Sequence, residues 1–298
     1  MVGLEYIIGV DAGGTKTEAV AYDFKGKELE TAYSGFGNMV IDRDVAIKNI
    51  LKAIDMCIKN LKEHTLKAIY LGVAAVEVGE NKDIIFNAVY DKFKTKVKVY
   101  NDGELALYSL LKGKEGILTI AGTGSICFGI LDSKKVVTGG WGHILGDEGS
   151  GYYIAIKALK KIIEEEESNL PKSEFRNRIL NKFNITDINE FKDLVYNSSK
   201  DKVASIMPLI CEMAEENEQY SNKILKEAGK DLGRTTEFAW KKLGSPSSIS
   251  IGIKGSVITK ASIVKNAFKD YINSKIENVN IIEDEVSSCK GAYYLSSK

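Results

Sequence analysis

One pattern of strand, turn and strand occurs twice in this chain, and it constrains the fold more than any other feature of the sequence. Residues 7–20 and 117–130 both consist of an apolar run, a turn rich in Gly, Thr and Ser, and a second apolar run. Each copy is followed by a polar turn and a further strand-like run, at 29–33 and at 136–138. Because an internal repeat fixes the architecture, this repeated three-strand meander predicts two related half-molecules.

The first turn of each copy is suited to phosphate. Glycine accepts positive φ, and a turn of Gly, Thr and Ser exposes backbone N–H groups and hydroxyls that can surround phosphate oxygens. For one such turn taken alone, an ordinary hairpin is the simpler interpretation, but the second copy favours two turns that hold a polyphosphate between them. Lys16 could neutralise phosphate charge or face solvent. The predicted phosphate-contacting residues are Gly13, Gly14, Thr15, Lys16, Gly122, Thr123, Gly124 and Ser125.

Composition narrows the class of protein. A length of 298 residues predicts two domains of ordinary size, and 44% hydrophobic residues are enough for two cores. Lys and Arg together number 41, as do Asp and Glu, so the charge gives no reason to expect nucleic acid or a membrane surface as partner. The first apolar run, residues 6–10, is too short for a signal peptide or a membrane-spanning helix, and we expect a cytoplasmic protein. The four cysteines are far apart, which argues against a disulfide framework or a zinc site.

The order of elements predicts an α/β fold with two domains. Residues 1–112 read as three strands followed by alternating helices and strands, a mixed sheet with helices packed on it. We expect the closing helix, residues 285–295, to join this domain as part of segment 284–298, and the second domain to comprise 113–283. In the second domain, a glycine-rich loop at 139–151 precedes a helix over 151–167, for which Ser150 is the expected N-cap. The pattern predicts a long helix over 221–243.

Two aspartates are candidates for chemistry. Asp102 follows a strand and precedes a helix, at a position where reacting groups collect in α/β sheets. Its carboxylate could accept the proton of an attacking hydroxyl, as the base of phosphoryl transfer does, although Asp is also a common helix N-cap. Asp11 lies beside the first phosphate turn, so coordination of Mg²⁺ through water is its natural role. The alternative for Asp11 is a residue that shapes the end of a strand.

These motifs resemble a known superfamily. The turns at 11–15 and 121–125, together with Gly255-Ser256-Val257, are similar to the two phosphate motifs and the adenosine motif of the actin-like superfamily of sugar kinases, actin and heat-shock chaperones. Gly140-Trp141-Gly142-His143, followed by 146–150, resembles the N-acetylglucosamine kinases of the BadF/BadG/BcrA/BcrD ATPase family. The resemblance implies two RNase-H-like (actin-like ATPase) domains around a central cleft for nucleotide and sugar.

The resemblance also implies roles for single residues. Asp102 would be the base that deprotonates the sugar 6-hydroxyl, and Asn38 would hold other sugar hydroxyls. For Trp141 a buried anchor of its loop is the alternative to sugar contact, and for Asp147 it is capping of the following helix. Close helix packing is the alternative for Gly229. The implied substrate contacts are Asn38, Asp102, Gly140, Trp141, Gly142 and Asp147, and the implied ATP contacts outside the two phosphate turns are Asp11, Ala228, Gly229, Gly255, Ser256 and Lys260.

The implied reaction is ATP- and Mg²⁺-dependent phosphorylation of an amino sugar by a homodimer. N-acetylglucosamine is the expected substrate, with N-acetylmuramic acid or glucosamine also open and a broad-specificity hexokinase acting on glucose as the nearest competitor. A second class is the ATPase activator of 2-hydroxyacyl-CoA dehydratases, which needs iron–sulfur cysteines at a dimer interface. Cys127 follows the second phosphate turn but has no suitably spaced partner in the sequence. A third class, a sugar-sensing regulator, would usually carry a DNA-binding segment, and no helix-turn-helix pattern precedes Tyr6.

Overall fold

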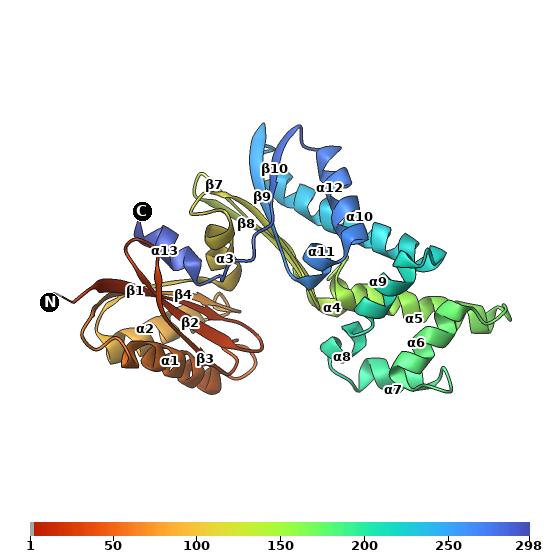
Figure 1. Cartoon of the computed structure of the whole chain (residues 1–298), viewed down its shortest axis with the longest axis horizontal. Coiled ribbons are helices and arrows are strands. Elements are labelled where there is room, and N and C mark those ends of the chain that lie inside the picture. Colours follow the sequence, from red (N-terminus) through yellow and green to blue (C-terminus); the bar gives the residue numbers. More distant parts are fainter. Residues whose placement is uncertain (1–2) are drawn as a thin grey trace. The chain divides into compact units, whose positions relative to one another are not determined.

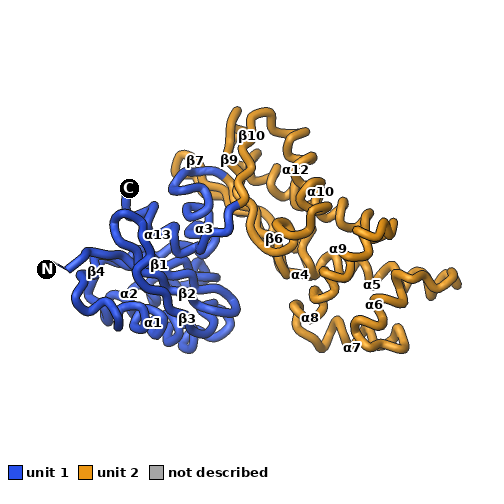
Figure 2. Tube along the Cα trace, viewed as in Figure 1, with its two compact units in different colours: residues 1–116, 284–298 blue, residues 117–283 orange. Residues whose placement is uncertain are grey.

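The computed structural model describes residues 3–298, and these form two compact units (Figure 2). Unit 1 contains the described residues up to Gly116 together with Asp284–Lys298, and unit 2 is the continuous segment Ile117–Glu283. Each unit has one five-stranded sheet with helices packed on it (Figure 1). The prediction of an α/β fold made of two related parts is confirmed.

The sheet of unit 1 has the strand order β3-β2-β1-β4-β5. The meander β1–β2–β3 is antiparallel, whereas β1, β4 and β5 run parallel to one another because helices connect them. The elements of unit 1 are β1 (Glu5–Ala12), β2 (Thr17–Asp23), β3 (Glu28–Ser34), α1 (Arg43–Lys59), β4 (Thr65–Val73), α2 (Asn81–Phe93), β5 (Lys96–Asn101), α3 (Asp102–Leu110) and α13 (Lys290–Ser296).

The sheet of unit 2 has the order β10-β9-β6-β7-β8, so β6, β7 and β8 occupy the places of β1, β2 and β3. The repeat predicted from the sequence is therefore present in the topology of both sheets. The elements are β6 (Gly116–Ala121), β7 (Ser125–Leu131), β8 (Lys134–Gly139), α4 (Gly142–Leu145), α5 (Gly151–Glu167), α6 (Glu174–Phe183), α7 (Glu190–Tyr196), α8 (Lys200–Ala204), α9 (Met207–Glu215), α10 (Gln219–Lys242), β9 (Ser248–Lys254), α11 (Ser256–Lys260), α12 (Ser262–Asn273) and β10 (Asn278–Ile282).

Both faces of the unit 1 sheet are covered. Successive residues of a strand point to opposite faces, so Ile8 and Val10 of β1 pack into the core that contains Ile50 and Ile54 of α1. On the other face, a Cβ at Gly9 would lie 2.2 Å from the carbonyl oxygen of Cys289, so only glycine permits this approach of the chain terminus. The C-terminal segment is therefore part of the core of unit 1.

The closing helix is shorter than the sequence pattern predicts. A helix over 285–295 was expected, but α13 begins at Lys290. Ahead of it, the Ser287 carbonyl accepts a hydrogen bond from Ser109 Oγ at 2.7 Å, and Ser287 Oγ donates to Glu18 at 2.7 Å. The carbonyl and hydroxyl of Ser287 thus bond to residues distant in the chain and not within a helix, which explains why α13 begins only at Lys290. Within residues 3–298, no helix combines the length and the apolar character needed to cross a bilayer.

Candidate active site

The carboxyl edge of the parallel strands in unit 1 carries both candidate aspartates. Asp11 pairs with Gly72 of β4, and Gly72 pairs with Tyr100 of β5, so these three residues form one row across the sheet. Strands lie about 4.8 Å apart, which puts the ends of β1 and β5 about 10 Å from each other. Asp102 follows Tyr100 by two residues, so it lies at the same edge as Asp11.

Asp102 is the first residue of α3 rather than its cap. The N-cap is Asn101, whose Oδ1 accepts a hydrogen bond from the Gly103 N–H at 2.9 Å. Asp102 Oδ1 also accepts from this N–H at 2.9 Å, and the residue is half-buried. The position of N-cap therefore belongs to Asn101 and not to Asp102.

The phosphate turn of unit 1, residues 13–16, has an open surface. The Gly13 N–H donates to the Lys16 carbonyl at 3.1 Å, and this bond closes the turn. Neither Gly13 nor Gly14 has a positive φ, so the expectation that glycine serves the backbone conformation is wrong here. A Cβ at Gly14 would meet no heavy atom within 4 Å, and Thr15 and Lys16 are exposed. Glycine at these positions leaves space in front of the turn.

Lys16 and Thr17, at the end of this turn, have different surroundings. Lys16 Nζ lies 5.0 Å from the centre of the Tyr33 ring, a cation–π contact at the surface. Thr17, the first residue of β2, is fully buried, and its hydroxyl has no hydrogen-bond partner among the described residues.

The loop that carries Asn38 rests on the phosphate turn. The Gly37 N–H donates to the Gly13 carbonyl at 2.9 Å, and a Cβ at Gly37 would lie 2.5 Å from that of Ala12. Asn38 is half-buried, and its Oδ1 accepts from the Val40 N–H at 2.9 Å. Unit 1 thus brings Asp11, the phosphate turn and Asn38 together at one edge of its sheet.

The phosphate turn of unit 2, residues 122–125, is held by the start of α5. The Gly122 carbonyl accepts from the Gly151 N–H at 2.8 Å, and the Thr123 carbonyl accepts from the Tyr152 N–H at 3.2 Å. Ser150 is the N-cap of α5, as expected, with its Oγ accepting from the Tyr153 N–H. The backbone of this turn is therefore fixed, while Gly122, Thr123 and Gly124 are only half-buried.

The glycine-rich loop packs against the same turn. Asp147 is buried, and its Oδ1 accepts from the Ser125 N–H at 3.2 Å. Ser125 Oγ donates to the Glu148 carbonyl at 2.8 Å, and the Ser125 carbonyl accepts from the Gly140 N–H at 3.1 Å. Gly124 leaves room for this carboxylate, since a Cβ there would lie 2.9 Å from Asp147 Oδ2. Asp147 therefore braces the phosphate turn and does not cap α5.

The middle of the loop is a short helix, α4, where the sequence analysis expected no regular element. Trp141, directly before α4, is 75% exposed, so it is not a buried anchor. Ile144 and Leu145 of α4 are exposed as well. Gly142, the first residue of α4, has φ +80°, a backbone conformation that favours glycine, and a Cβ there would meet no heavy atom within 4 Å.

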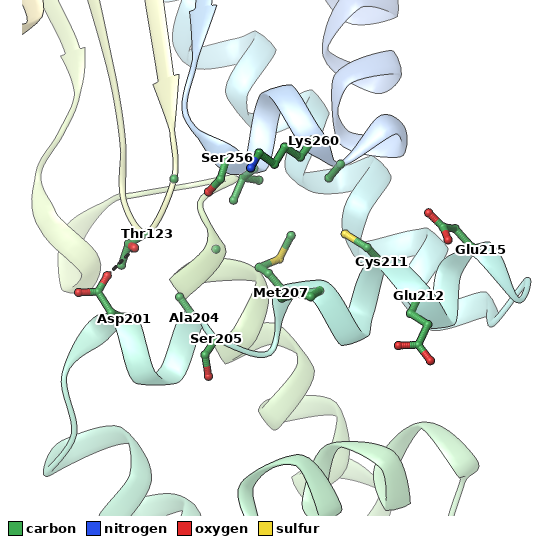
Figure 3. A pocket seen from close by; sticks show the side chains of 15 residues that line it. Thr123, Asp201, Ala204, Ser205, Met207, Cys211, Glu212, Glu215, Ser256 and Lys260 are labelled. Atoms are coloured by element: carbon green, nitrogen blue, oxygen red, sulfur yellow. Dashed lines mark hydrogen bonds between the residues drawn. The ribbon is translucent and has the colours of Figure 1, made fainter. Parts of the chain in front are cut away.

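A pocket of about 600 Å³ opens beside the phosphate turn of unit 2 (Figure 3). Gly122 and Thr123 line it together with Ser256 and Lys260 of α11, so four predicted ATP contacts meet here. The turn before α11 touches the strand end that precedes the phosphate turn of unit 2. Gly255, with φ +99°, packs on Ala121, and a Cβ at Gly255 would lie 2.4 Å from the Ala121 carbonyl oxygen.

The opposite wall of the pocket was not predicted. Asp201 of α8 accepts a hydrogen bond from Thr123 Oγ1 at 2.6 Å. Met207, Cys211 and Glu215 of α9 also line the pocket. The sequences of α8 and α9 show a helical pattern but no motif. These helices line the pocket because they pack beside the phosphate turn of unit 2.

Ala228 and Gly229 do not line this pocket, and both are buried in α10. The Ala228 carbonyl lies against Gly149, where a Cβ would be 2.5 Å from its oxygen. A Cβ at Gly229 would lie 2.3 Å from the Val264 carbonyl oxygen, so this glycine permits close packing of α10 on α12. Contact of these two residues with nucleotide stays a prediction.

The cysteines and acids of residues 3–298 form no metal centre of their own. No group of three or more His, Cys, Asp or Glu in this part of the chain could hold a metal ion. Cys57, Cys127 and Cys289 are buried, and burial raises the pKa of the Cys127 thiol to about 11. Thiols buried in a core are poor candidates for ligands of a cluster shared between subunits.

Comparison with known proteins places these features in a family. A sequence model of the BadF/BadG/BcrA/BcrD ATPase family matches residues 8–293. An N-acetylmuramic acid/N-acetylglucosamine kinase from Clostridium acetobutylicum is 29% identical over 98% of each chain. An N-acetyl-D-glucosamine kinase from Dictyostelium discoideum is also 29% identical over 98% of each chain. A solved structure from Chromobacterium violaceum, 19% identical, has the same fold with a TM-score of 0.73 over 98% of this chain and 99% of that one.

Proposed function

Because this chain belongs to the BadF/BadG/BcrA/BcrD ATPase family, we propose that it is an ATP-dependent kinase that phosphorylates the 6-hydroxyl of an amino sugar, with N-acetylglucosamine as the preferred substrate. Two relatives that align over nearly their whole length are kinases of N-acetylglucosamine, and one of them also acts on N-acetylmuramic acid by its name. The observation that carries the proposal is the pair of related turns, one in each sheet, at the same topological place.

Each unit supplies a different part of the proposed reaction. In unit 2, the pocket beside Thr123 and Ser256 would hold the nucleotide. In unit 1, the Asp102 carboxylate would accept the proton of the sugar 6-hydroxyl. The oxygen of this hydroxyl would attack the γ-phosphorus of ATP, and the bond from that phosphorus to the bridging oxygen would break and release ADP. The Asn38 Oδ1 is bonded within its own loop, so the NH₂ group of this side chain would donate to a sugar hydroxyl.

Asp11 fits the Mg²⁺ that this reaction would require. Proteins usually hold Mg²⁺ through one or two carboxylates, several waters and the phosphates of the substrate, and not through a cage of side chains. Asp11 is a half-buried carboxylate beside the open phosphate turn, which fits this mode. Mg²⁺ would neutralise charge on the phosphates.

A coupled assay of ADP release tests the activity and the substrate together. Glucose, glucosamine, N-acetylglucosamine and N-acetylmuramic acid are compared, and N-acetylglucosamine is expected to give the highest kcat/KM, with NMR placing the phosphate on the 6-oxygen. A higher kcat/KM for glucose would favour a hexokinase. A brown protein that hydrolyses ATP without sugar stimulation would favour the iron–sulfur activator.

The variant Asp102→Asn tests the proposed base. Asparagine keeps the size of the side chain but cannot accept the proton, so kcat is expected to fall by at least about 10²-fold while sugar binding persists. Calorimetric titration with N-acetylglucosamine serves as the control for binding. Near-normal kcat in this variant would reject the role of Asp102.

A further inference from the structure

Asp201 contacts Thr123, the threonine of the phosphate turn in unit 2. Its Oδ1 accepts the hydrogen bond of Thr123 Oγ1 at 2.6 Å, and both residues line the pocket (Figure 3). A threonine hydroxyl has one proton to donate. A phosphate oxygen can therefore accept from Thr123 only when Asp201 gives up this bond.

Neighbouring elements hold the backbones that carry the two residues. The backbone of the phosphate turn is tied to α5 through the carbonyls of Gly122 and Thr123. Asp201 lies in the first turn of α8, which is anchored by the fully buried side chain of Val203 and capped by Ser199. The side chain of Asp201 itself is exposed.

Acidic side chains outnumber basic ones along the described lining of the pocket, which disfavours a bound anion. Asp201, Glu212 and Glu215 line it, whereas Lys260 is its one basic side chain among the described residues. A polyphosphate without a bound cation at Thr123 would lie beside the Asp201 carboxylate, and like charges at short distance repel. A divalent cation carried by the phosphates would remove much of this repulsion.

We infer that Asp201 is a specificity-determining residue that competes with the nucleotide for the Thr123 hydroxyl and disfavours nucleotide without a bound divalent cation. The inference rests on the proposed function, because it takes the pocket of unit 2 as the ATP site. Asp201 lies outside every recognised motif. It would favour ATP and ADP that carry a divalent cation over the same nucleotides without one.

Calorimetric titration with ADP tests the inference in the full-length chain. Asp201→Asn keeps the size of the side chain, removes its charge and weakens the hydrogen bond that holds the Thr123 hydroxyl, because a neutral amide oxygen is a weaker acceptor than a carboxylate. This variant is expected to bind ADP in the presence of EDTA at least about fivefold more tightly than the wild type. Saturating Mg²⁺ should reduce this advantage to less than about twofold, since the cation offsets the charge of Asp201.

Glu215→Gln is the matched control. It removes the same charge from the same pocket, but Glu215 does not accept the Thr123 hydrogen bond, so a change in Kd of less than about twofold is expected. Three results would overturn the inference: no tighter binding by Asp201→Asn, an equal gain by Glu215→Gln, or an advantage that Mg²⁺ leaves unchanged. Failure of the wild type to bind ADP with or without Mg²⁺ would overturn the pocket assignment as well, which separates the two failures.

Discussion

At the scale of single residues, Gly14 lies on the open surface of the first phosphate turn. Its φ is not positive, and a Cβ at this position would meet no heavy atom within 4 Å. Glycine costs conformational entropy on folding, so a glycine that neither the backbone nor the packing requires needs another explanation. Access of phosphate oxygens to the backbone N–H groups of the turn supplies one.

Gly14→Ala should therefore separate stability from activity. The free energy of unfolding is expected to stay the same or to rise by up to about 1 kcal/mol, because alanine restricts the unfolded chain. The KM for ATP should rise by about tenfold or more, since the added methyl group keeps the phosphates from the N–H groups of the turn.

Denaturant unfolding and steady-state kinetics on the same preparation measure both effects. The KM for the sugar serves as an internal control and should change by less than about twofold. A loss of stability as large as the loss of ATP affinity would mean that Gly14 is required by the fold.

The residues of the two phosphate turns and of the adenosine motif were selected from the sequence because they carry recognisable patterns of Gly, Thr and Ser, and their contact with nucleotide stays a prediction. It could not predict that Asp147 braces the second turn, because that contact joins residues 22 positions apart in the chain. Asp201 was missed for the same reason, since its partner Thr123 is 78 positions away. Contacts of this kind depend on how helices pack, and no local pattern records them.

At the scale of elements, α10 and α12 of unit 2 pack closely against each other. Gly229 and Gly233 of α10 allow this approach, and a Cβ at Gly233 would lie 2.7 Å from the Tyr271 ring. Glu237 of α10 fixes the pair further, because it accepts from Tyr271 Oη at 2.7 Å and forms an ion pair with Lys241 at 2.6 Å. The bonds with Lys241 and Tyr271 hold the pKa of Glu237 below its ordinary value.

Glu237→Gln is expected to lower the free energy of unfolding by about 1–2 kcal/mol at pH 7, because a buried charged hydrogen bond is lost. A carboxylate with a lowered folded-state pKa contributes stability above its ordinary pKa and loses it as the pH falls through the folded pKa. The difference between wild type and variant should therefore shrink as the pH is lowered below about 4.5.

Chemical denaturation across this pH range measures the difference. Glu277→Gln is the control, because Glu277 is exposed in the same unit and should show a small, nearly pH-independent effect. A difference for Glu237→Gln that stays constant between pH 7 and pH 3 would refute the linkage.

Most helices and strands were predictable, because apolar periodicity and caps mark them locally. Helix α5 begins at Gly151 and ends at Glu167, as the pattern predicted. The start of α13 was not predictable, because the hydrogen bonds of Ser287 to Ser109 and Glu18 connect distant parts of the chain. Helix α4 was missed because its four residues lie within a run of glycines.

At the scale of the whole molecule, unit 1 is built from both ends of the chain. Cys289, Ala292 and Leu295 from the C-terminal segment are buried in it. A Cβ at Gly291 would lie 2.2 Å from the Leu105 carbonyl oxygen, so α13 packs directly on the backbone of α3. The helix that begins with Asp102 is thus supported by the last residues of the chain.

A chain that ends at Glu283 should lose kinase activity while it keeps ADP binding. Truncation removes the segment that covers β1 and α3, so unit 1 loses core contacts, whereas unit 2 is continuous and remains intact. Activity assays, calorimetry with MgADP and hydrogen exchange measure these outcomes, and exchange should increase in β1 and α3 but not in β6 or β9.

Removal of Ser297 and Lys298 alone is the control. Both residues follow α13, and the contact with α3 that this removes is the cation–π pair of Lys298 with Tyr108, worth about 0.5–1 kcal/mol, so the effect should be small. Full activity of the chain that ends at Glu283 would show that α13 does not support Asp102.

The discontinuity of unit 1 sets an order of events during synthesis on the ribosome. Unit 2 is one continuous segment, so all of its residues are made before residue 284. Residues 284–298 belong to unit 1 but are made after the whole of unit 2. The sheet of unit 1 therefore has the surface that faces Cys289 uncovered until these residues are made.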